Sequence, residues 1–452
     1  MTSPDRSGEL LAIAERVVAM AGPGEQVEAY VSRGLSTEVR VYQGEVEHFV
    51  SAQSEGIGIR VIRDGRTGTS YAGTLDSSVI TDVLAEARDN LGYAEVDEWA
   101  GLAEPDGVPI TPQELWNVAL EGTSTSTKIE LAKELEKLTL GLDRRVRVDD
   151  ANYADSFGEA AVATSTGIRA AGRENGCYVS VGTLADDGDE TQTGFGFAVG
   201  RAVDELDISR AASEAVDRAT RLLGATKPAS RRVTVVLDPY VTAQFLSVIG
   251  GTLSGDAVAR GRSLFANRLG DAVASPLLTL VDDPTNPLAY TATDIDGEGL
   301  AARRNVLIDA GRLDRFVHSS YSARRLGARP TGNGVRGGYA GSPGAGCLAL
   351  QVVPGVRSQA ELVADVADGI LVQQVQGLHS GVNAVSGDFS TGAAGLVIEN
   401  GTVGRPVREF TIASTLQRML LDIAEVGGDL EWLPMRSAGV SLVIHDVTMS
   451  GS

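Results

Sequence analysis

The stretch that decides the fold reads Val241-Thr-Ala-Gln-Phe-Leu-Ser-Val-Ile-Gly-Gly-Thr-Leu-Ser-Gly-Asp-Ala-Val-Ala-Arg-Gly-Arg-Ser263. It follows an apolar run, Val233 to Leu237, and then Asp238-Pro239, where Asp is a typical helix cap and Pro suits the first turn. Apolar residues recur at helical spacing up to Ile249, and Gly250-Gly251 predicts the end of the helix. A strand therefore leads into a helix with one buried face.

Working outward, the C-terminal half contains further characteristic segments in a fixed order. They are Val281-Asp-Asp-Pro284, Asp294-Ile-Asp-Gly-Glu-Gly299, Tyr321-Ser-Ala-Arg-Arg-Leu-Gly327, Thr331-Gly-Asn333, Ser386-Gly-Asp-Phe-Ser390, Ile398-Glu-Asn-Gly401 and Thr411-Ile-Ala413. With the helix before them, these segments resemble the TldD/TldE (PmbA) family of zinc peptidases. The resemblance covers roughly residues 230 to 450 well and the N-terminal half in general layout. Ser414-Thr415 departs from it, because the family usually has Gly-Asn there.

In the catalytic branch of that family the helix carries His-Glu-x-x-x-His followed by Gly-x-x-Gly-Asp. With Gly255-Asp256 as the anchor, the first His falls on Leu246, the Glu on Ser247 and the second His on Gly251. Zinc takes imidazole or thiolate ligands, and its water needs a carboxylate base, so these three positions are degenerate. The cysteine ligand of the catalytic branch is also absent between Val426 and Ser452. This pattern is similar to the TldE/PmbA branch.

Length and composition predict more than one domain and an acidic surface. The chain has 452 residues, 43% of them hydrophobic, and a net charge of −21, which disfavours binding to a phosphate backbone. Two cysteines allow no disulfide framework. Met1 to Gly8 is polar and no run of eighteen apolar residues occurs, so we expect no secretory signal and no membrane span. We therefore expect a cytoplasmic protein that binds neither nucleic acid nor membrane.

The predicted fold class is α+β, with the main boundary at Lys227-Pro228. Residues 1–228 are expected to form a domain of helices and antiparallel meanders with an internal repeat: helix, meander, Leu-Asp-x-Ser, helix. Residues 229–452 are expected to form a strand-rich, barrel-like, peptidase-like domain whose site is degenerate. The pattern predicts short strands at 27–32, 37–43, 45–53 and 56–63, a linker at 93–122 that packs on the surface, and a helix at 411–426.

Four groups of polar residues have more than one interpretation. Asp294, Asp296 and Glu298 alternate as calcium ligands do, but the twelfth position is Asn305, which favours a solvated turn. Arg324-Arg325 suit an anion or, preferably, a local acid. Ser386-Gly-Asp388 is expected to be a tight hairpin rather than a nucleophile turn. The remaining group lacks metal-ligand spacing, which favours isolated side chains; it contains His318, His379, His445 and Cys347.

The resemblance implies the noncatalytic subunit of a heterodimeric cytosolic zinc metallopeptidase that degrades or matures small or unfolded peptides. The implied partner is a TldD-like chain with an intact His-Glu-x-x-x-His, so zinc is expected in that partner and no cofactor in this chain. The expected substrate-channel residues are Gly255, Asp256, Asn333, Ser386 and Asp388. Two alternatives stay open. One is a subunit recruited to natural-product biosynthesis, such as carbon–sulfur bond cleavage, and the other is a protein that modulates gyrase.

Overall fold

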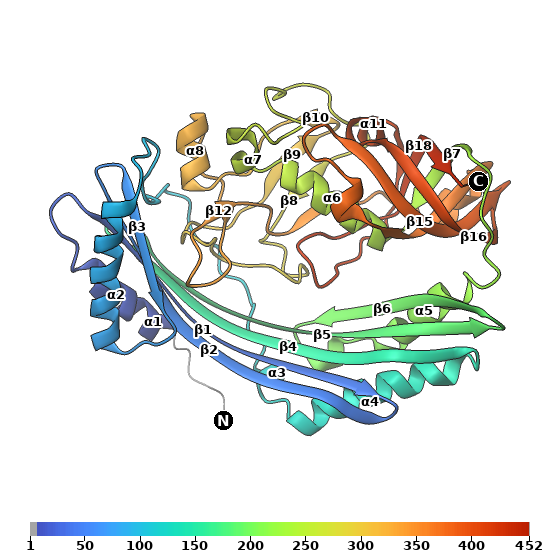
Figure 1. Cartoon of the computed structure of the whole chain (residues 1–452), viewed down its shortest axis with the longest axis horizontal. Coiled ribbons are helices and arrows are strands. Elements are labelled where there is room, and N and C mark those ends of the chain that lie inside the picture. The colour runs from blue at the N-terminus through green and yellow to red at the C-terminus, as the bar shows by residue number, and fades with distance from the viewer. Residues whose placement is uncertain (1–6, 452) are drawn as a thin grey trace.

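The computed structural model of the chain describes residues 7–451; residues 1–6, part of the polar start considered above, and residue 452 lie outside it. Long strands form a curved six-stranded antiparallel sheet in the N-terminal part, and a closed β-barrel forms the C-terminal part. The barrel and its loops lie on the concave side of the curved sheet (Figure 1). The predicted α+β class with a barrel-like C-terminal domain is confirmed.

The N-terminal part consists of two similar halves joined edge to edge. Each half runs helix, three strands, helix, and the sheet order β3-β2-β1-β4-β5-β6 places the first strands of the two halves side by side. This is the repeat predicted from the sequence. The elements are α1 (Ser7–Val18), β1 (Gln26–Tyr42), β2 (Glu45–Arg63), β3 (Arg66–Ala72), α2 (Ser77–Asn90), a 3-10 turn (Leu91–Tyr93), α3 (Val118–Glu121), α4 (Thr125–Leu142), β4 (Val146–Thr164), β5 (Arg169–Asp187), β6 (Glu190–Gly200), a 3-10 turn (Val203–Glu205) and α5 (Ile208–Thr220).

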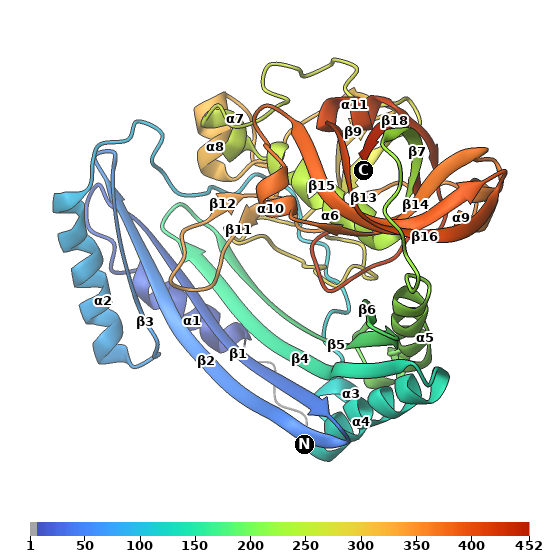
Figure 2. The ribbon, with the colours of Figure 1, turned by 45° about the vertical axis from the view of Figure 1, so that its right-hand side comes forward.

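The helices of both halves cover one face of the sheet. Val27 and Val31 of β1 pack in the cluster under α1 and α2, while Val39 and Val41 pack in the cluster under α4 and α5. These residues share one parity along the strand, so both clusters lie on the same, convex face. Figure 2 shows the helix pairs at the two ends of that face. The other face is therefore left for the C-terminal part.

The strands of the N-terminal sheet are longer than the sequence predicts. Residues 27–32 and 37–43 form one strand, β1, and residues 45–53 and 56–63 form one strand, β2. The expected break at Gly34 does not occur, because Gly34 pairs with Ser54 on one side and Gly158 on the other. Pairing on both edges keeps the backbone extended where local composition suggests a turn.

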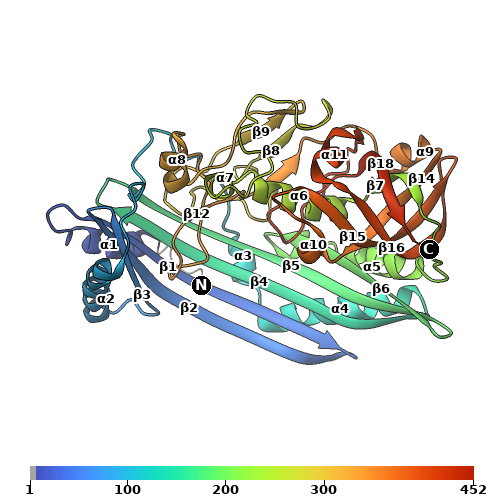
Figure 3. The ribbon, with the colours of Figure 1, turned by 45° about the horizontal axis from the view of Figure 1, so that its top comes forward.

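The barrel of the C-terminal part has the order β16-β15-β14-β7-β18-β17, and it closes through pairing of β16 with β18. Apart from the parallel pair β7–β14, its strands are antiparallel. Figure 3 shows this barrel beside α6. Its strands and helices are β7 (Arg231–Leu237), α6 (Pro239–Thr252), α7 (Gly255–Ala259), α9 (Gln359–Ala364), β14 (Asp368–Gln376), α10 (Leu378–Gly381), β15 (Asp388–Glu399), β16 (Thr402–Thr415), α11 (Leu416–Leu421), β17 (Ile423–Val426) and β18 (Leu442–Ser450).

A smaller sheet and a short ribbon complete the C-terminal part. The sheet has the order β10-β9-β8-β13, and β11 pairs with β12. Their bounds, with that of the helix between them, are β8 (Leu280–Asp282), β9 (Asn305–Asp309), β10 (Arg312–Leu313), α8 (Ser320–Leu326), β11 (Gly334–Val335), β12 (Gly344–Ala345) and β13 (Leu350–Val352).

Two helix predictions in this half are wrong in extent. The segment 411–426 contains only the short helix α11, because barrel pairing holds Thr411–Ala413 against β18 and β17 against the other end of β18. Helix α6 continues through Gly250-Gly251 to Thr252. Gly250 is required there by packing rather than by helix termination, since a Cβ would lie 2.8 Å from Leu350.

The linker 93–122 packs as predicted, with Leu102, Ala103 and Leu115 buried. Arg324 holds it, but the predicted partner is wrong. Its guanidinium donates to the carbonyl oxygens of Trp99 and Leu102, both at 3.0 Å, instead of to a local acid. Within residues 7–451, no helix has both the length and the apolar composition needed to cross a bilayer.

Candidate functional site

Helix α6 places the three degenerate positions in three different surroundings. Leu246 is fully buried in the barrel core. The hydroxyl of Ser247 donates to the carbonyl of Ala243 at 3.0 Å, and its Oγ lies 2.7 Å from Oγ of Ser437. Gly251 is exposed, and a Cβ there would meet no atom within 4 Å. In a regular helix, positions five residues apart point about 140° apart, so 246 and 251 do not converge.

This site does not fit a zinc ion. Leu246 and Gly251 offer no lone pair, and Ser247 supplies no carboxylate base. The thiol of Cys347 lies beside the helix, 3.9 Å from the carbonyl oxygen of Gly250, and burial raises its pKa well above the usual value. Across the described range 7–451, no three His, Cys, Asp or Glu side chains are grouped so that they could hold a metal ion.

Three of the five expected channel residues hold the segment after β12. The carboxylate of Asp256 accepts from the backbone N–H of Ala345 at 2.9 Å, and the amide of Asn333 donates to the carbonyl of Gly346 at 3.1 Å. Gly255 must be glycine, because a Cβ would lie 2.3 Å from Nδ1 of His318. Asn333 is fully buried and also donates to Asp282 at 2.6 Å. The structure thus brings these residues together as a support for this segment.

Ser386 and Asp388 lie at the start of β15. Both are exposed, and the hydroxyl of Ser386 donates to the carboxylate of Asp388 at 2.6 Å. The backbone N–H of Gly387 donates to the carbonyl of Asn383 at 2.8 Å, which closes the predicted tight turn. No printed bond joins this pair to Asp256 or Asn333 within residues 7–451, so the five expected channel residues divide into two groups.

The histidines occupy separate places. His318 is buried, with Nδ1 3.4 Å from Oγ of Ser322, and burial lowers its pKa. His445 lies on β18, where Nδ1 is 3.0 Å from Oγ1 of Thr234. His379 lies on the short helix α10. The prediction that these residues are isolated side chains agrees with this placement.

The prediction of a solvated turn at Asp294 to Glu298 is wrong. Asp296 and Glu298 are 3% and 1% exposed. Backbone N–H groups replace water: Asp296 accepts from Gly334 at 2.7 Å and from Leu300 at 2.9 Å, and Glu298 accepts from Ser320 at 2.7 Å. Burial, together with the neighbouring charge of Glu298, raises the pKa of Asp296 to about 7.

A buried ion cluster joins the N-terminal sheet to the C-terminal part. Glu28 of β1 is 1% exposed; one carboxylate oxygen accepts from Arg60 of β2 at 2.8 Å and the other from Arg336. Burial alone would raise the pKa of Glu28, but the two guanidinium groups outweigh it and the pKa is lowered. The guanidinium of Arg336 also lies over the ring of Tyr30, 5.0 Å from its centroid. The cluster fixes the loop after β11 against the concave face.

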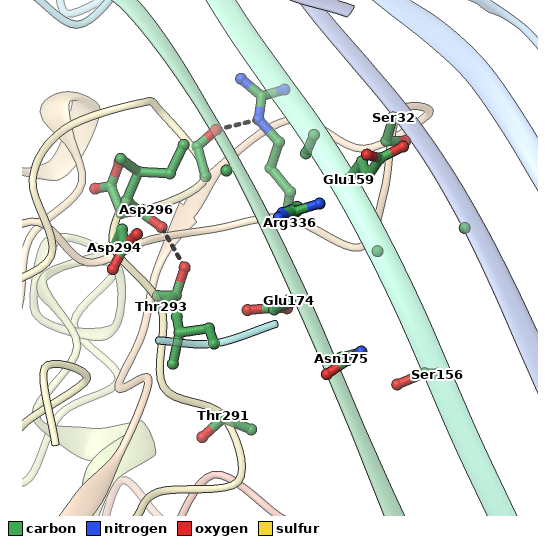
Figure 4. A pocket seen from close by; sticks show the side chains of 18 of the residues that line it. Ser32, Ser156, Glu159, Glu174, Asn175, Thr291, Thr293, Asp294, Asp296 and Arg336 are labelled. Atoms are coloured by element: carbon green, nitrogen blue, oxygen red, sulfur yellow. Dashed lines mark hydrogen bonds between the residues drawn. The ribbon is translucent and has the colours of Figure 1, made fainter. Parts of the chain in front are cut away.

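Next to this cluster lies a cavity of about 510 Å³, between the concave face of the sheet and the loops 290–297 and 334–336. Such a volume lies in the range of small-ligand pockets. Figure 4 shows Glu174 between its strand and the loop that carries Thr293 and Asp294. Arginine, carboxylate, tyrosine and apolar side chains all contribute to the lining.

Comparisons with known proteins agree with this architecture. Residues 230–451 match the family model described as PmbA/TldA metallopeptidase C-terminal domain, residues 119–223 match the central domain, and residues 27–91 match domain 1. The chain belongs to the PmbA/TldD family. As a member of the PmbA/TldD family it is 26% identical to metalloprotease PmbA of Escherichia coli O157:H7, over 97% of this chain and 95% of that protein.

Two crystal structures of similar proteins have the same fold. TldE from Thermococcus kodakarensis superimposes with a TM-score of 0.89 at 24% identity, covering 98% of this chain and 99% of that one. A protein from Bacteroides thetaiotaomicron, named as a suggested modulator of DNA gyrase, superimposes with a TM-score of 0.85 at 26% identity, covering 99% of this chain and 100% of that one.

Sequence reasoning missed the ion cluster and the cavity. Glu28 lies in an otherwise apolar strand, Val27-Glu28-Ala29, where alternation predicts an exposed side chain. Glu174 lies in Arg173-Glu174-Asn175, which reads as a polar turn. Nothing local shows that Arg336, far along the chain, would cover the first or that a loop would enclose the second.

We expect the purified chain to hold no stoichiometric zinc, because the two imidazole positions are Leu246 and Gly251. Elemental analysis of the chain after dialysis measures this directly, with a catalytic TldD-like protein as the positive control. One tightly bound zinc per chain, lost on replacing His318, His379 or His445 by alanine, would contradict the prediction.

Proposed function

We propose that this chain is the noncatalytic subunit of a two-chain cytosolic zinc peptidase that degrades or matures small or unfolded peptides. The observation that carries the proposal is the frame of the family's helix with Leu246, Ser247 and Gly251 in the places of its ligands and base. The names of its relatives as metalloproteases support the peptidase class. A chain that keeps the fold without the ligands is suited to supply part of a chamber.

The proposed partner is a TldD-like chain with an intact His-Glu-x-x-x-His. Related chains most often associate through closed two-fold pairing, which two members of one family can imitate by using equivalent surfaces. Zinc and the catalytic carboxylate then come from the partner. The surroundings of Ser247 favour this division of labour, since its hydroxyl is already bonded to Ala243 and Ser437 and does not face an open metal position.

Mixing tests the proposal. Each chain alone and an equimolar mixture are incubated with an unstructured peptide, and products are followed by mass spectrometry. We expect cleavage by the mixture only, and a native mass of one copy of each chain or a small multiple. Replacing the motif Glu of the partner by Gln should abolish the activity of the mixture. Full activity of the partner alone, unchanged by this chain, would overturn the proposal and favour the biosynthetic or gyrase alternatives.

A further inference from the structure

The cavity beside the ion cluster exists because two neighbouring residues lack side chains. Gly34 of β1 pairs with Gly158 of β4, and Gly158 pairs with Glu174 of β5, so the three residues form one row across the sheet. A Cβ on Gly158 would meet no atom within 4 Å. The row therefore presents one carboxylate beside an open hollow on the concave face.

Most charged groups in the lining are already satisfied. Asp296 accepts from backbone N–H groups, and Arg336 pairs with Glu28. Arg201 donates to the carbonyl oxygens of Asn175 at 2.8 Å and Ala289 at 3.1 Å. These bonds hold Arg201 in place as part of the wall rather than leaving it as an anion receptor.

Glu174 is different. Its side chain is reached by solvent through the cavity, while protein surrounds it on the other sides. Within residues 7–451 its carboxylate accepts no hydrogen bond. Burial raises its pKa, Arg201 opposes this, and the charge of Asp294 adds to it. Asp294 uses one carboxylate oxygen to accept from the backbone N–H of Gln113 at 2.9 Å.

Two carboxylates with unused oxygens at one end of a hollow call for a hydrogen-bond donor that carries positive charge. A primary ammonium has three donors and no acceptor, which matches carboxylates that have only lone pairs to offer. A metal ion is the poorer match, because no three ligating side chains are grouped among the described residues. Tyr30, Tyr290, Leu115 and Leu348 provide apolar surface around the remainder of the hollow.

We propose that this cavity binds the primary ammonium group of a peptide, with Glu174 as its main acceptor and Asp294 as the second. That the ligand is a peptide rests on the proposed function; that its bound group is an ammonium rests on the cavity itself. The ammonium comes from either the amino terminus or a lysine side chain, which are chemically equivalent at this site. This chain then holds one end of a peptide by charge and hydrogen bonding, away from α6.

Calorimetric titration of the full chain with three probes tests the proposal. The probes are trialanine amide, its N-acetylated form, and N-acetyl-lysine amide. We expect trialanine amide or N-acetyl-lysine amide to bind, and which of them binds identifies the source of the ammonium. N-acetyl-trialanine amide should bind about ten- to a hundredfold more weakly than the better probe, the loss typical of a charge-assisted hydrogen bond.

Two variants localise the binding. Glu174→Gln keeps the shape and removes the charge, and should weaken the better probe by about ten- to a hundredfold. Gly158→Leu fills the hollow without a clash and should abolish binding with the fold retained by circular dichroism. Glu38→Gln is the matched control, an exposed carboxylate on the same face of β1 that is outside the lining, and should bind like the wild type.

Equal affinity for the acetylated and free peptides, or unchanged affinity in Glu174→Gln, would overturn the proposal. So would failure of both cationic probes to bind. Since titration uses this chain alone, its failure is distinguishable from failure of the proposed function. Cleavage by the mixed chains with no ammonium binding here would leave the subunit role standing and remove only the site.

Discussion

Replacing Arg336 by Met is expected to lower the free energy of unfolding by about 3–5 kcal/mol, the cost of leaving a buried charge without one of its partners. The side chains of Arg336 and Glu28 are 5% and 1% exposed, so water cannot replace the lost contact. Glu28 would keep only Arg60, at 2.8 Å. The carbonyl oxygen of Gly341, which accepts from Arg336 at 3.0 Å, would also lose its donor.

Chemical denaturation followed by tryptophan fluorescence measures this effect. Arg325→Met is the matched control, because Arg325 lies in the last turn of α8 and its one printed bond, 3.3 Å to the hydroxyl of Tyr321, is exposed. We expect that variant to stay within about 0.5 kcal/mol of the wild type. Adding Glu28→Gln to Arg336→Met should restore part of the loss, since it removes the stranded charge. An Arg336→Met protein as stable as the wild type would refute the role of the cluster.

Local signals in the sequence predicted helix starts well. Asp76, Asp207 and Asp238 each accept a backbone N–H in the first turn of the helix that follows, as expected for caps. A cap depends on residues two or three positions away, so the sequence contains all the information needed. The register of the degenerate motif, which places Leu246 and Gly251 on α6, depends on similarly short distances along the chain.

Strand length and the cavity could not be predicted in this way. The extension of β1 through Gly34 depends on Gly158, more than a hundred residues later, which continues the ladder where local composition favours a break. The hollow beside Glu174 requires three strands to be in register and a loop at 290–297 to cover them. The burial of Asp296, which overturned the solvated turn, likewise depends on Gly334 supplying an N–H from another segment.

The second large effect is a stability that falls as pH rises from 6 to 8. Burial raises the pKa of Asp282 to about 6 and that of Glu431 to about 7, and burial with the charge of Glu298 raises that of Asp296 to about 7. The folded chain therefore holds protons in this range that the unfolded chain has released, so unfolding becomes easier as pH rises. Buried His318, with its lowered pKa, acts the opposite way and cancels part of the effect.

Denaturation midpoints at pH 6 and pH 8 should differ by about 2–3 kcal/mol in unfolding free energy, with the protein more stable at pH 6. Below about pH 4.5 the trend should reverse, because Glu28 has a lowered pKa and its ion pairs are lost as it takes up a proton. Asp296→Asn should be less stable at both pH values, since one oxygen no longer accepts from a backbone N–H, yet show a difference smaller by about 1.4 kcal/mol. A wild-type protein that is more stable at pH 8 than at pH 6 would show that these carboxylates are ionised in the folded chain as readily as in the unfolded one.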